Sequence, residues 1–417
     1  MQPYLILPFL IIIAYKTAQW RLATTELAAE PQWRSKLWRA VLFNIIGFGA
    51  ILLYFNLNYG FVTDDVNYYY PSLELDMPFS EVISGGDFMR YITRPFSYYL
   101  SLQLLSMHFI FGTIGFLGSL FYFYTFTQRV QDENVPFLLH GWAPFWAFYC
   151  FPNFLAWGRI YGKDTTVFFL GAIFTFSAFR ILKKKVRPLD VLVVCLSVYF
   201  MQIIRPHVAG VIGAGFMIGL AYKYFVETPI EKNIFKKILI PMILVIGMTF
   251  LVANMARKVT MKQKGEEELT QESIQSTLIT TTMQGAYGGS KTDLATEMKE
   301  NPEIVYSPGQ ILENVAYLLL APMPWQVRGA ADFVALLSNI VMVYIVFRFG
   351  RKIRLFDSVQ ISYLATVIGL VLVLSFMTAN VGLLLRQKTI ILPFLFLLLF
   401  SRPSAEKSEG AEDVVTS

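Results

Sequence analysis

The residues most able to do chemistry stand together in the octapeptide Trp157-Gly158-Arg159-Ile160-Tyr161-Gly162-Lys163-Asp164. Glycines flank its two cations, and an apolar stretch of helical length follows it. Because the N-terminus of a helix directs backbone N–H groups outward, cations beside it suit the binding of a phosphate group. Asp164 also stands where the N-cap of that helix belongs and could pair with Lys163, so a structural capped turn is the alternative.

A second motif, Arg205-Pro206-His207, stands at the expected junction of two apolar segments. Pro206 explains a turn there, but not the arginine and histidine that flank it. The planar guanidinium of Arg205 could bind phosphate oxygens in pairs, and a neutral imidazole could serve as a base or hydrogen-bond donor. A lone histidine is more often structural, as we expect for His108 and His140 in or beside apolar stretches. His207 stands at an outward-facing junction, so we favour a functional role for it.

An acidic and aromatic cluster contains Asp64, Asp65 and three consecutive tyrosines, Tyr68-Tyr69-Tyr70. Paired carboxylates can act as a general base and its orienting partner, or accept hydrogen bonds from sugar hydroxyls, while aromatic faces suit sugar rings. The alternative is a solvated loop with interfacial tyrosines. We therefore take Asp64, Asp65 and His207 as the candidate catalytic residues.

The composition shows which kind of protein must position these residues. Of 417 residues, 55% are apolar and 15% are charged, with a mean hydropathy of +0.51. Soluble chains carry about 25% charged residues, so a soluble enzyme, a disordered chain and a single-anchor receptor are excluded. Only three histidines and two cysteines are present, so we expect no metal and no other cofactor. The fold class predicted is an all-α, polytopic integral membrane protein.

We expect about eleven membrane-spanning helices within one transmembrane domain, residues 1–400. The apolar segments are approximately 3–19, 38–57, 98–127, 136–156, 165–182, 189–204, 208–225, 237–255, 331–348, 358–378 and 381–400. Lysine and arginine concentrate in alternate loops, which the positive-inside rule assigns to the cytoplasm. This predicts an external N-terminus, a cytoplasmic C-terminus and a disordered tail, 401–417. Two long segments, 58–97 and 256–330, would be external and carry interfacial helices, the second acting as a lid or acceptor platform.

Several cations remain on the predicted external side: Arg90, Arg94, Arg159, Lys163, Arg205, Arg257, Lys258, Arg328 and Arg386. Charged groups at membrane depth are costly and normally face a cavity or a partner. Snorkelling to lipid head groups is the alternative, and it suits Arg257 and Lys258 best. The net charge of +6 follows from topology and predicts no nucleic-acid partner.

Five short runs together resemble bacterial polytopic membrane proteins encoded among surface-polysaccharide genes. They are Phe151-Pro152-Asn153-Phe154, Gly162-Lys163-Asp164, Arg205-Pro206-His207-Val208-Ala209, Pro322-Met323-Pro324-Trp325-Gln326, and Asn380-Val381-Gly382 followed by Arg386-Gln387-Lys388. The family is similar in plan to Wzy-type and EpsG-type repeat-unit polymerases. The chain departs from its pattern at Gln326, where glutamate is usual, and at Lys388, where arginine is usual, which puts any catalytic carboxylate at position 326 in doubt.

The resemblance implies a metal-independent glycosyltransferase of the bacterial cytoplasmic membrane that joins undecaprenyl-pyrophosphate-linked oligosaccharides at the outer face. Membrane lipids, a chain-length regulator and a flippase would be its other partners. Arg159, Lys163, Arg205 and Arg386 would stabilise the leaving pyrophosphate. Arg90, Asp164, Trp325 and Arg328 would complete the substrate site. The alternatives are a transporter for lipid-linked glycans, a transferase that uses a polyprenyl-phosphate monosaccharide, and a non-catalytic assembly protein.

Overall fold

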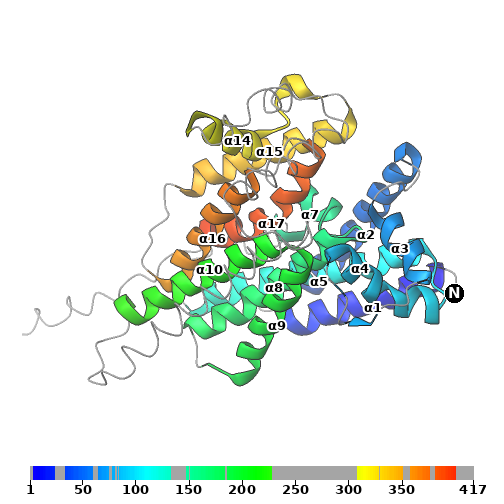
Figure 1. Ribbon diagram of the computed structural model, residues 1–417, viewed down its shortest axis with the longest axis horizontal. Helices are drawn as coiled ribbons and strands as arrows, with labels where there is room; N and C mark the ends of the chain where they lie inside the picture. The colour runs from blue at the N-terminus through cyan, green and yellow to red at the C-terminus, as the bar shows by residue number, and fades with distance from the viewer. Residues whose placement is uncertain are drawn as a thin grey trace, which may run out of the picture.

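The computed structural model of the protein consists of helices and their connections throughout the part of the chain that it describes (Figure 1). The described residues are 3–23, 33–59, 64–74, 78–79, 82, 84–132, 147–149, 151–183, 186–227, 308–327, 329–350, 357–375 and 381–400. The predicted spans at 136–156 and 237–255 fall largely or wholly outside these ranges, as do most of 256–330 and the tail 401–417.

The helices follow one another along the chain as α1 (Pro3–Leu22), α2 (Trp33–Tyr59), α3 (Asp64–Leu73), α4 (Gly85–Arg94), η3 (Pro95–Tyr99), α5 (Leu104–Asp132), α7 (Pro152–Ala156), α8 (Lys163–Lys183), α9 (Pro188–Ile204), α10 (Pro206–Tyr222), η4 (Lys223–Glu227), α14 (Pro308–Leu320), η6 (Pro324–Gln326), α15 (Ala330–Gly350), α16 (Ser358–Ser375) and α17 (Val381–Phe400).

Six helical stretches in the described ranges are long and apolar enough to cross a membrane. They are Trp33–Tyr54, Leu104–Arg129, Lys163–Lys183, Pro206–Glu227, Asp332–Gly350 and Ser358–Ser375. The shorter helices Pro188–Ile204 and Ile311–Leu320 are also apolar. These helices confirm the prediction of an all-α membrane protein with several spans.

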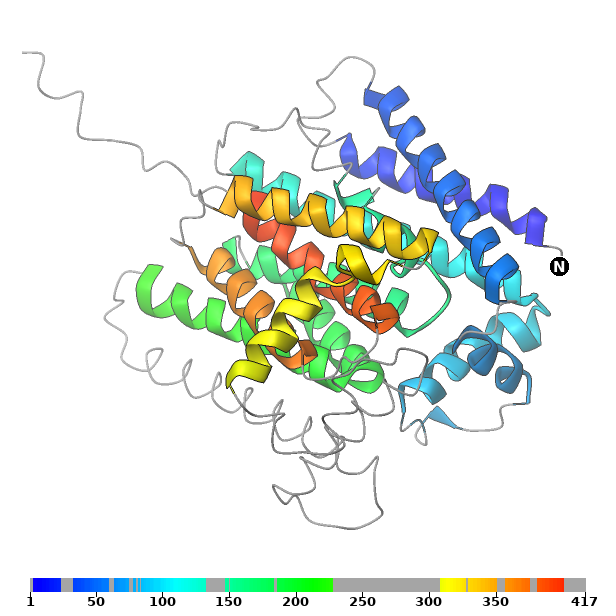
Figure 2. The same cartoon turned by 90° about the horizontal axis from the view of Figure 1, so that it is seen from above.

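Helix α8 occupies the centre of the bundle, whereas α15 lies at its edge. The most apolar window of α8 is 67% buried and that of α15 is 22% buried, so α15 leaves most of its surface for lipid. α5 and α9 pack against α8, and α17 touches it as well. Figures 1 and 2 show α14 and α15 over α16 and α17, with α1 and α2 crossing at another edge of the molecule.

Small residues bring α10 and α16 into close contact. A side-chain carbon added at Gly215 would lie 2.1 Å from the Thr366 hydroxyl, and one added at Gly219 would lie 2.6 Å from the Ser358 carbonyl oxygen. The two glycines are four residues apart and share one helix face, which is the small-residue pattern of tightly packed membrane helices.

Ion pairs join four helices at one end of the bundle, where the sequence predicted cytoplasmic loops. The Asp357 carboxylate accepts a hydrogen bond at 2.7 Å from Arg129 and lies 3.4 Å from the Lys183 ammonium. Arg180 pairs with Asp190 at 3.2 Å. These contacts connect the end of α5, the end of α8, the start of α9 and the start of α16. The starts of α8 and α10 therefore lie toward the opposite end.

Much of the predicted external loop 58–97 is helical. Ser84 and Asp87 form a capping box that starts α4, in which the Asp87 amide donates to the Ser84 hydroxyl at 3.2 Å. α3 packs against α4. In the second long segment, where the sequence predicted an interfacial helix, α14 is a short apolar helix that ends before Pro322.

Candidate functional site

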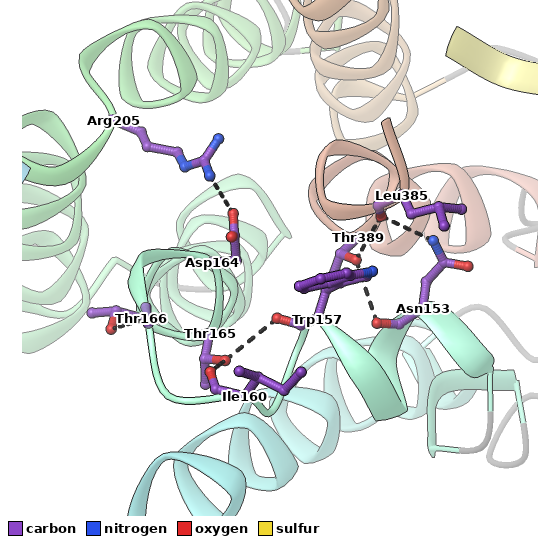
Figure 3. Close-up of polar contacts among 10 residues, drawn as sticks. Asn153, Trp157, Ile160, Asp164, Thr165, Thr166, Arg205, Leu385 and Thr389 are labelled. Carbon is purple, nitrogen blue, oxygen red and sulfur yellow. Dashed lines mark hydrogen bonds and ion pairs between the residues drawn. The ribbon is translucent and has the colours of Figure 1, made fainter. Parts of the chain in front are cut away.

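The octapeptide 157–164 forms a turn that leads into α8, and hydroxyl groups of α8 hold it closed (Figure 3). The Thr165 hydroxyl donates to the Ile160 carbonyl oxygen, and the Thr166 hydroxyl donates to the Gly162 carbonyl oxygen at 3.1 Å. α8 begins at Lys163, so Asp164 lies inside the first helical turn and not at the N-cap. The alternative of a turn capped by Asp164 is therefore wrong, because the helix begins one residue earlier.

Asp164 accepts a hydrogen bond from the guanidinium of Arg205 (Figure 3). The two side chains are 12% and 14% exposed, so the ion pair is largely shielded from solvent. Arg205 has a non-helical backbone (φ −143°, ψ 84°) because it precedes Pro206, the first residue of α10. His207 follows in the first turn of α10 and is half-buried. The sequence motif thus forms the predicted bend, and its arginine joins α10 to α8.

Arg386 contributes a second cation from α17. Its guanidinium carbon lies 4.4 Å from the centre of the Trp157 ring, a cation–π contact. Asn153 secures this side of the turn, since its side-chain amide donates to the Leu385 carbonyl oxygen at 3.0 Å (Figure 3). The Thr389 hydroxyl donates to the same oxygen at 3.2 Å. α17 is therefore attached to the turn immediately beside Arg386.

Lys163 contributes a third cation, and it faces α3 and α4. Its ammonium lies 5.5 Å from the centre of the Tyr68 ring and 3.9 Å from the position of a side-chain carbon at Gly86. At Gly85 such a carbon would lie 2.5 Å from the Ile204 carbonyl oxygen, which only glycine permits. The starts of α4, α8 and α10 therefore meet at one place.

Asp65 is buried, with 1% of its surface exposed. Its carboxylate lies 2.8 Å from His108 Nε2, and His108 Nδ1 accepts a hydrogen bond at 3.3 Å from the Tyr161 amide. His108 is buried, as expected of a structural histidine, and its two ring nitrogens connect a carboxylate to the turn. Asp64 is the first residue of α3, and its side chain, like all of Arg328, lies outside the described part.

Arg159 has different neighbours from Arg205. It is 2% exposed, its guanidinium donates to the Tyr149 carbonyl oxygen at 3.3 Å, and its guanidinium carbon lies 5.5 Å from the Phe116 ring centre. It also lines a cavity of about 60 Å³ between α1, α2 and α5, whose walls are otherwise mainly apolar. Arg159 therefore belongs to the core beneath the turn.

Two predicted binding residues lie at exposed positions. Arg90 pairs with Asp87 at 3.4 Å and donates to the Asn67 carbonyl oxygen, so it links α4 to α3. Trp325 in η6 is 80% exposed. The neighbouring Gln326 accepts a hydrogen bond at 2.8 Å from the Met323 amide.

Lys388 was not among the predicted site residues, and it is 2% exposed within α17. Its ammonium donates to the Ala321 carbonyl oxygen at 2.6 Å and to the Asn339 side-chain oxygen at 2.7 Å. A lysine inside an apolar stretch already indicates a buried polar partner, because a charged group at membrane depth is costly without one. It joins α17 to α15 and to the end of α14.

No group of three metal-ligating side chains occurs in the described ranges. Comparison of the chain with protein-family models, curated proteins and solved structures gives no match. Function is therefore inferred from the side chains.

Proposed function

We propose that the protein is a membrane glycosyltransferase of the polysaccharide-polymerase type. It would act on undecaprenyl-pyrophosphate-linked glycans at the outer face of a bacterial cytoplasmic membrane, with about eleven spans and an external N-terminus. The observation that carries the proposal is the placement of Lys163, Arg205 and Arg386, from three helices, around the turn 157–164. Cations from three helices that border one turn in an apolar protein suit a ligand with more than one negative charge.

In this reaction the hydroxyl oxygen of the acceptor glycan attacks the anomeric carbon of the donor. The glycosidic bond forms as the bond from that carbon to the pyrophosphate oxygen breaks, and the pyrophosphate leaves with the electron pair. Its developing negative charge needs fixed cations. Among described residues, the guanidinium of Arg205 forms its hydrogen bond with Asp164 through one nitrogen. Since arginine has five N–H donors, donors remain for phosphate oxygens, and Asp164 orients them.

The base that takes the acceptor proton is assigned to Asp64 or His207. Asp65 is unsuited to this role, because it is buried against His108 and out of reach of a substrate. His207 lies two residues from Arg205 at the same bend. A base must lie within hydrogen-bond reach of the acceptor hydroxyl, and His207 would meet this requirement if the acceptor enters at this bend.

Aromatic faces suit sugar rings, and two tryptophans are candidates for such contacts. Trp157 lies against Arg386, and Trp325 presents 80% of its surface. Trp325 belongs to the segment 256–330, which we assign as the lid or acceptor platform that keeps water from the donor.

The polysaccharide made by a deletion strain tests this proposal. We expect gels to show loss of the long-chain ladder while single repeat units remain. Loss of one sugar from each unit would instead support a monosaccharide transferase, and an unchanged ladder would contradict both. If the protein were instead a transporter for lipid-linked glycans, the deletion strain should accumulate repeat units at the inner face of the membrane. A lectin added to intact cells would not reach units held at the inner face, whereas it would reach unpolymerised units at the outer face.

A further inference from the structure

A buried chain of hydrogen bonds runs from α3 through α5 to the turn that precedes Lys163. It begins at Asp65, whose carboxylate lies 2.8 Å from His108 Nε2. It continues from His108 Nδ1, which lies 3.3 Å from the Tyr161 amide nitrogen. The side chains of Asp65 and His108 are 1% and 2% exposed, so neither can touch a substrate in solution or in the membrane.

The direction of each hydrogen bond follows from the backbone. An amide N–H can only donate, so His108 Nδ1 must accept and carries no hydrogen. The hydrogen of a neutral imidazole is then on Nε2, where it faces the Asp65 carboxylate. A carboxylate that fixes the tautomer and orientation of an imidazole is a known arrangement in active sites. Here the imidazole holds a backbone amide.

The side chain of Tyr161 strengthens the same connection. Its ring makes edge contacts with His108 and Phe111, with ring centres 6.0 Å and 4.8 Å apart. Its hydroxyl lies 2.6 Å from the Thr93 hydroxyl, which itself donates to the Met89 carbonyl oxygen, so Tyr161 is the donor. Burial raises the pKa of the Tyr161 phenol, which keeps it protonated for this role.

Lys163 follows Tyr161 by two residues, and its ammonium lies over the ring of Tyr68. Tyr68 in turn makes an edge contact with Tyr161. A shift of the Tyr161 backbone would therefore move Lys163 and also the start of α8, where Asp164 holds Arg205.

We propose that His108 and Asp65 are positioning residues that hold the turn 157–162 and thereby place Lys163 and Asp164 for binding a lipid-linked phosphate. The phosphate ligand rests on the proposed function, whereas the hydrogen-bond chain and its effect on Lys163 do not.

The tautomer of His108 gives the first test. The chain has three histidines, so ¹⁵N-imidazole spectra of the full-length protein in nanodiscs can be assigned with single variants. We expect a protonated Nε2 and an unprotonated Nδ1 for His108. A hydrogen on Nδ1 would overturn the proposal.

The second test compares His108→Leu with Phe111→Leu. Both remove contacts with the Tyr161 ring, but only the first removes hydrogen bonds. We expect the rate at which an amine-reactive ester labels Lys163, followed by mass spectrometry, to change severalfold in His108→Leu and little in Phe111→Leu. His108→Asn, which retains a donor and an acceptor, should restore part of the wild-type rate. Equal labelling rates in all variants would overturn the proposal. If His108→Leu does not fold, Asp65→Asn takes its place in the comparison.

Binding of undecaprenyl pyrophosphate, measured by native mass spectrometry, completes the experiment. We expect His108→Leu to weaken it roughly 10- to 100-fold, by analogy with the loss seen when the hydrogen-bond partner of a metal ligand is removed. Unchanged affinity would contradict the positioning role. If the wild-type protein does not bind this lipid while the tautomer and labelling results hold, the ligand assignment fails and the positioning of Lys163 stands.

Discussion

The guanidinium of Arg205, at the bend before α10, and the carboxylate of Asp164, in the first turn of α8, form an ion pair between residues 41 apart in the sequence. Pro206 fixes the bend on one side of the pair and the closed turn before Lys163 fixes the other. This geometry holds a largely shielded cation in one orientation. Transition-state charge is stabilised best by groups that are oriented beforehand.

Replacing Arg205 with lysine should abolish polymer formation nearly as completely as replacing it with alanine. A lysine ammonium is a point charge that cannot pair with Asp164 and bind phosphate oxygens in the same plane. Loss of one such contact typically costs about 2.7–4 kcal/mol, or roughly a hundred- to thousandfold in rate. The rate of glycan extension by the purified protein measures it.

Arg180→Lys is the matched control, because Arg180 also pairs with an aspartate and lies on the same helix as Asp164. We expect near wild-type extension from this variant. Equal losses in Arg205→Lys and Arg180→Lys would show that the effect is one of general stability.

The contact between Arg386 and Trp157 should show measurable coupling. Cation–π contacts contribute about 0.5–2 kcal/mol, depending on how far they are desolvated. In a double-mutant cycle with Arg386→Gln and Trp157→Leu, we expect a coupling energy in this range for binding of undecaprenyl pyrophosphate. Trp157→Phe retains an aromatic face and should lose less. If the effects of the two substitutions are strictly additive, the two residues are not coupled, and Arg386 acts only as an independent membrane anchor.

Packing between α10 and α16 should make Gly219 intolerant of larger residues. A side-chain carbon there would lie 2.6 Å from the Ser358 carbonyl oxygen, so α10 must move away from α16. Overpacking of this kind costs typically about 1–3 kcal/mol. Thermal unfolding in detergent should show a lower midpoint for Gly219→Ala, whereas Gly49→Ala in α2, where nothing lies within 4 Å, should not be destabilised.

Cysteine labelling in cells tests the predicted topology. In a background with both native cysteines replaced, Ser290→Cys should react with an impermeant reagent from outside, and Lys184→Cys only after the membrane is opened. These positions belong to loops of opposite predicted side because basic residues concentrate around 184. The reverse pattern would invert the proposed orientation of the whole bundle.

Sequence patterns predicted the helices well where hydrophobic length and proline decide the outcome. The apolar stretch after Lys163 forms α8, and Pro206 ends one helix and starts the next, as local rules require. The partners of polar residues could not be predicted in the same way. His108 stands in an apolar stretch and its carboxylate partner is 43 residues away, so only the fold brings them together.

Arg159 shows the same limit in the opposite direction. It stands four residues before Lys163, and the sequence grouped the two as one cationic site. The turn directs them to different neighbours, Arg159 to the Phe116 ring and Lys163 to the Tyr68 ring. The direction of each side chain in a tight turn depends on backbone dihedrals that composition and spacing do not specify.

Reconstituted synthesis tests the central claim most directly. The purified protein in nanodiscs would receive undecaprenyl-pyrophosphate-linked repeat units as the sole glycan, and mass spectrometry would follow the products. From the wild type we predict a series of lengthened lipid-linked glycans together with released undecaprenyl pyrophosphate. Arg205→Lys should form both products at least a hundredfold more slowly, which is about the loss expected for one transition-state contact. If the purified protein instead moves these lipids across the membrane of liposomes and forms no new glycosidic bond, the assignment as a glycosyltransferase is contradicted.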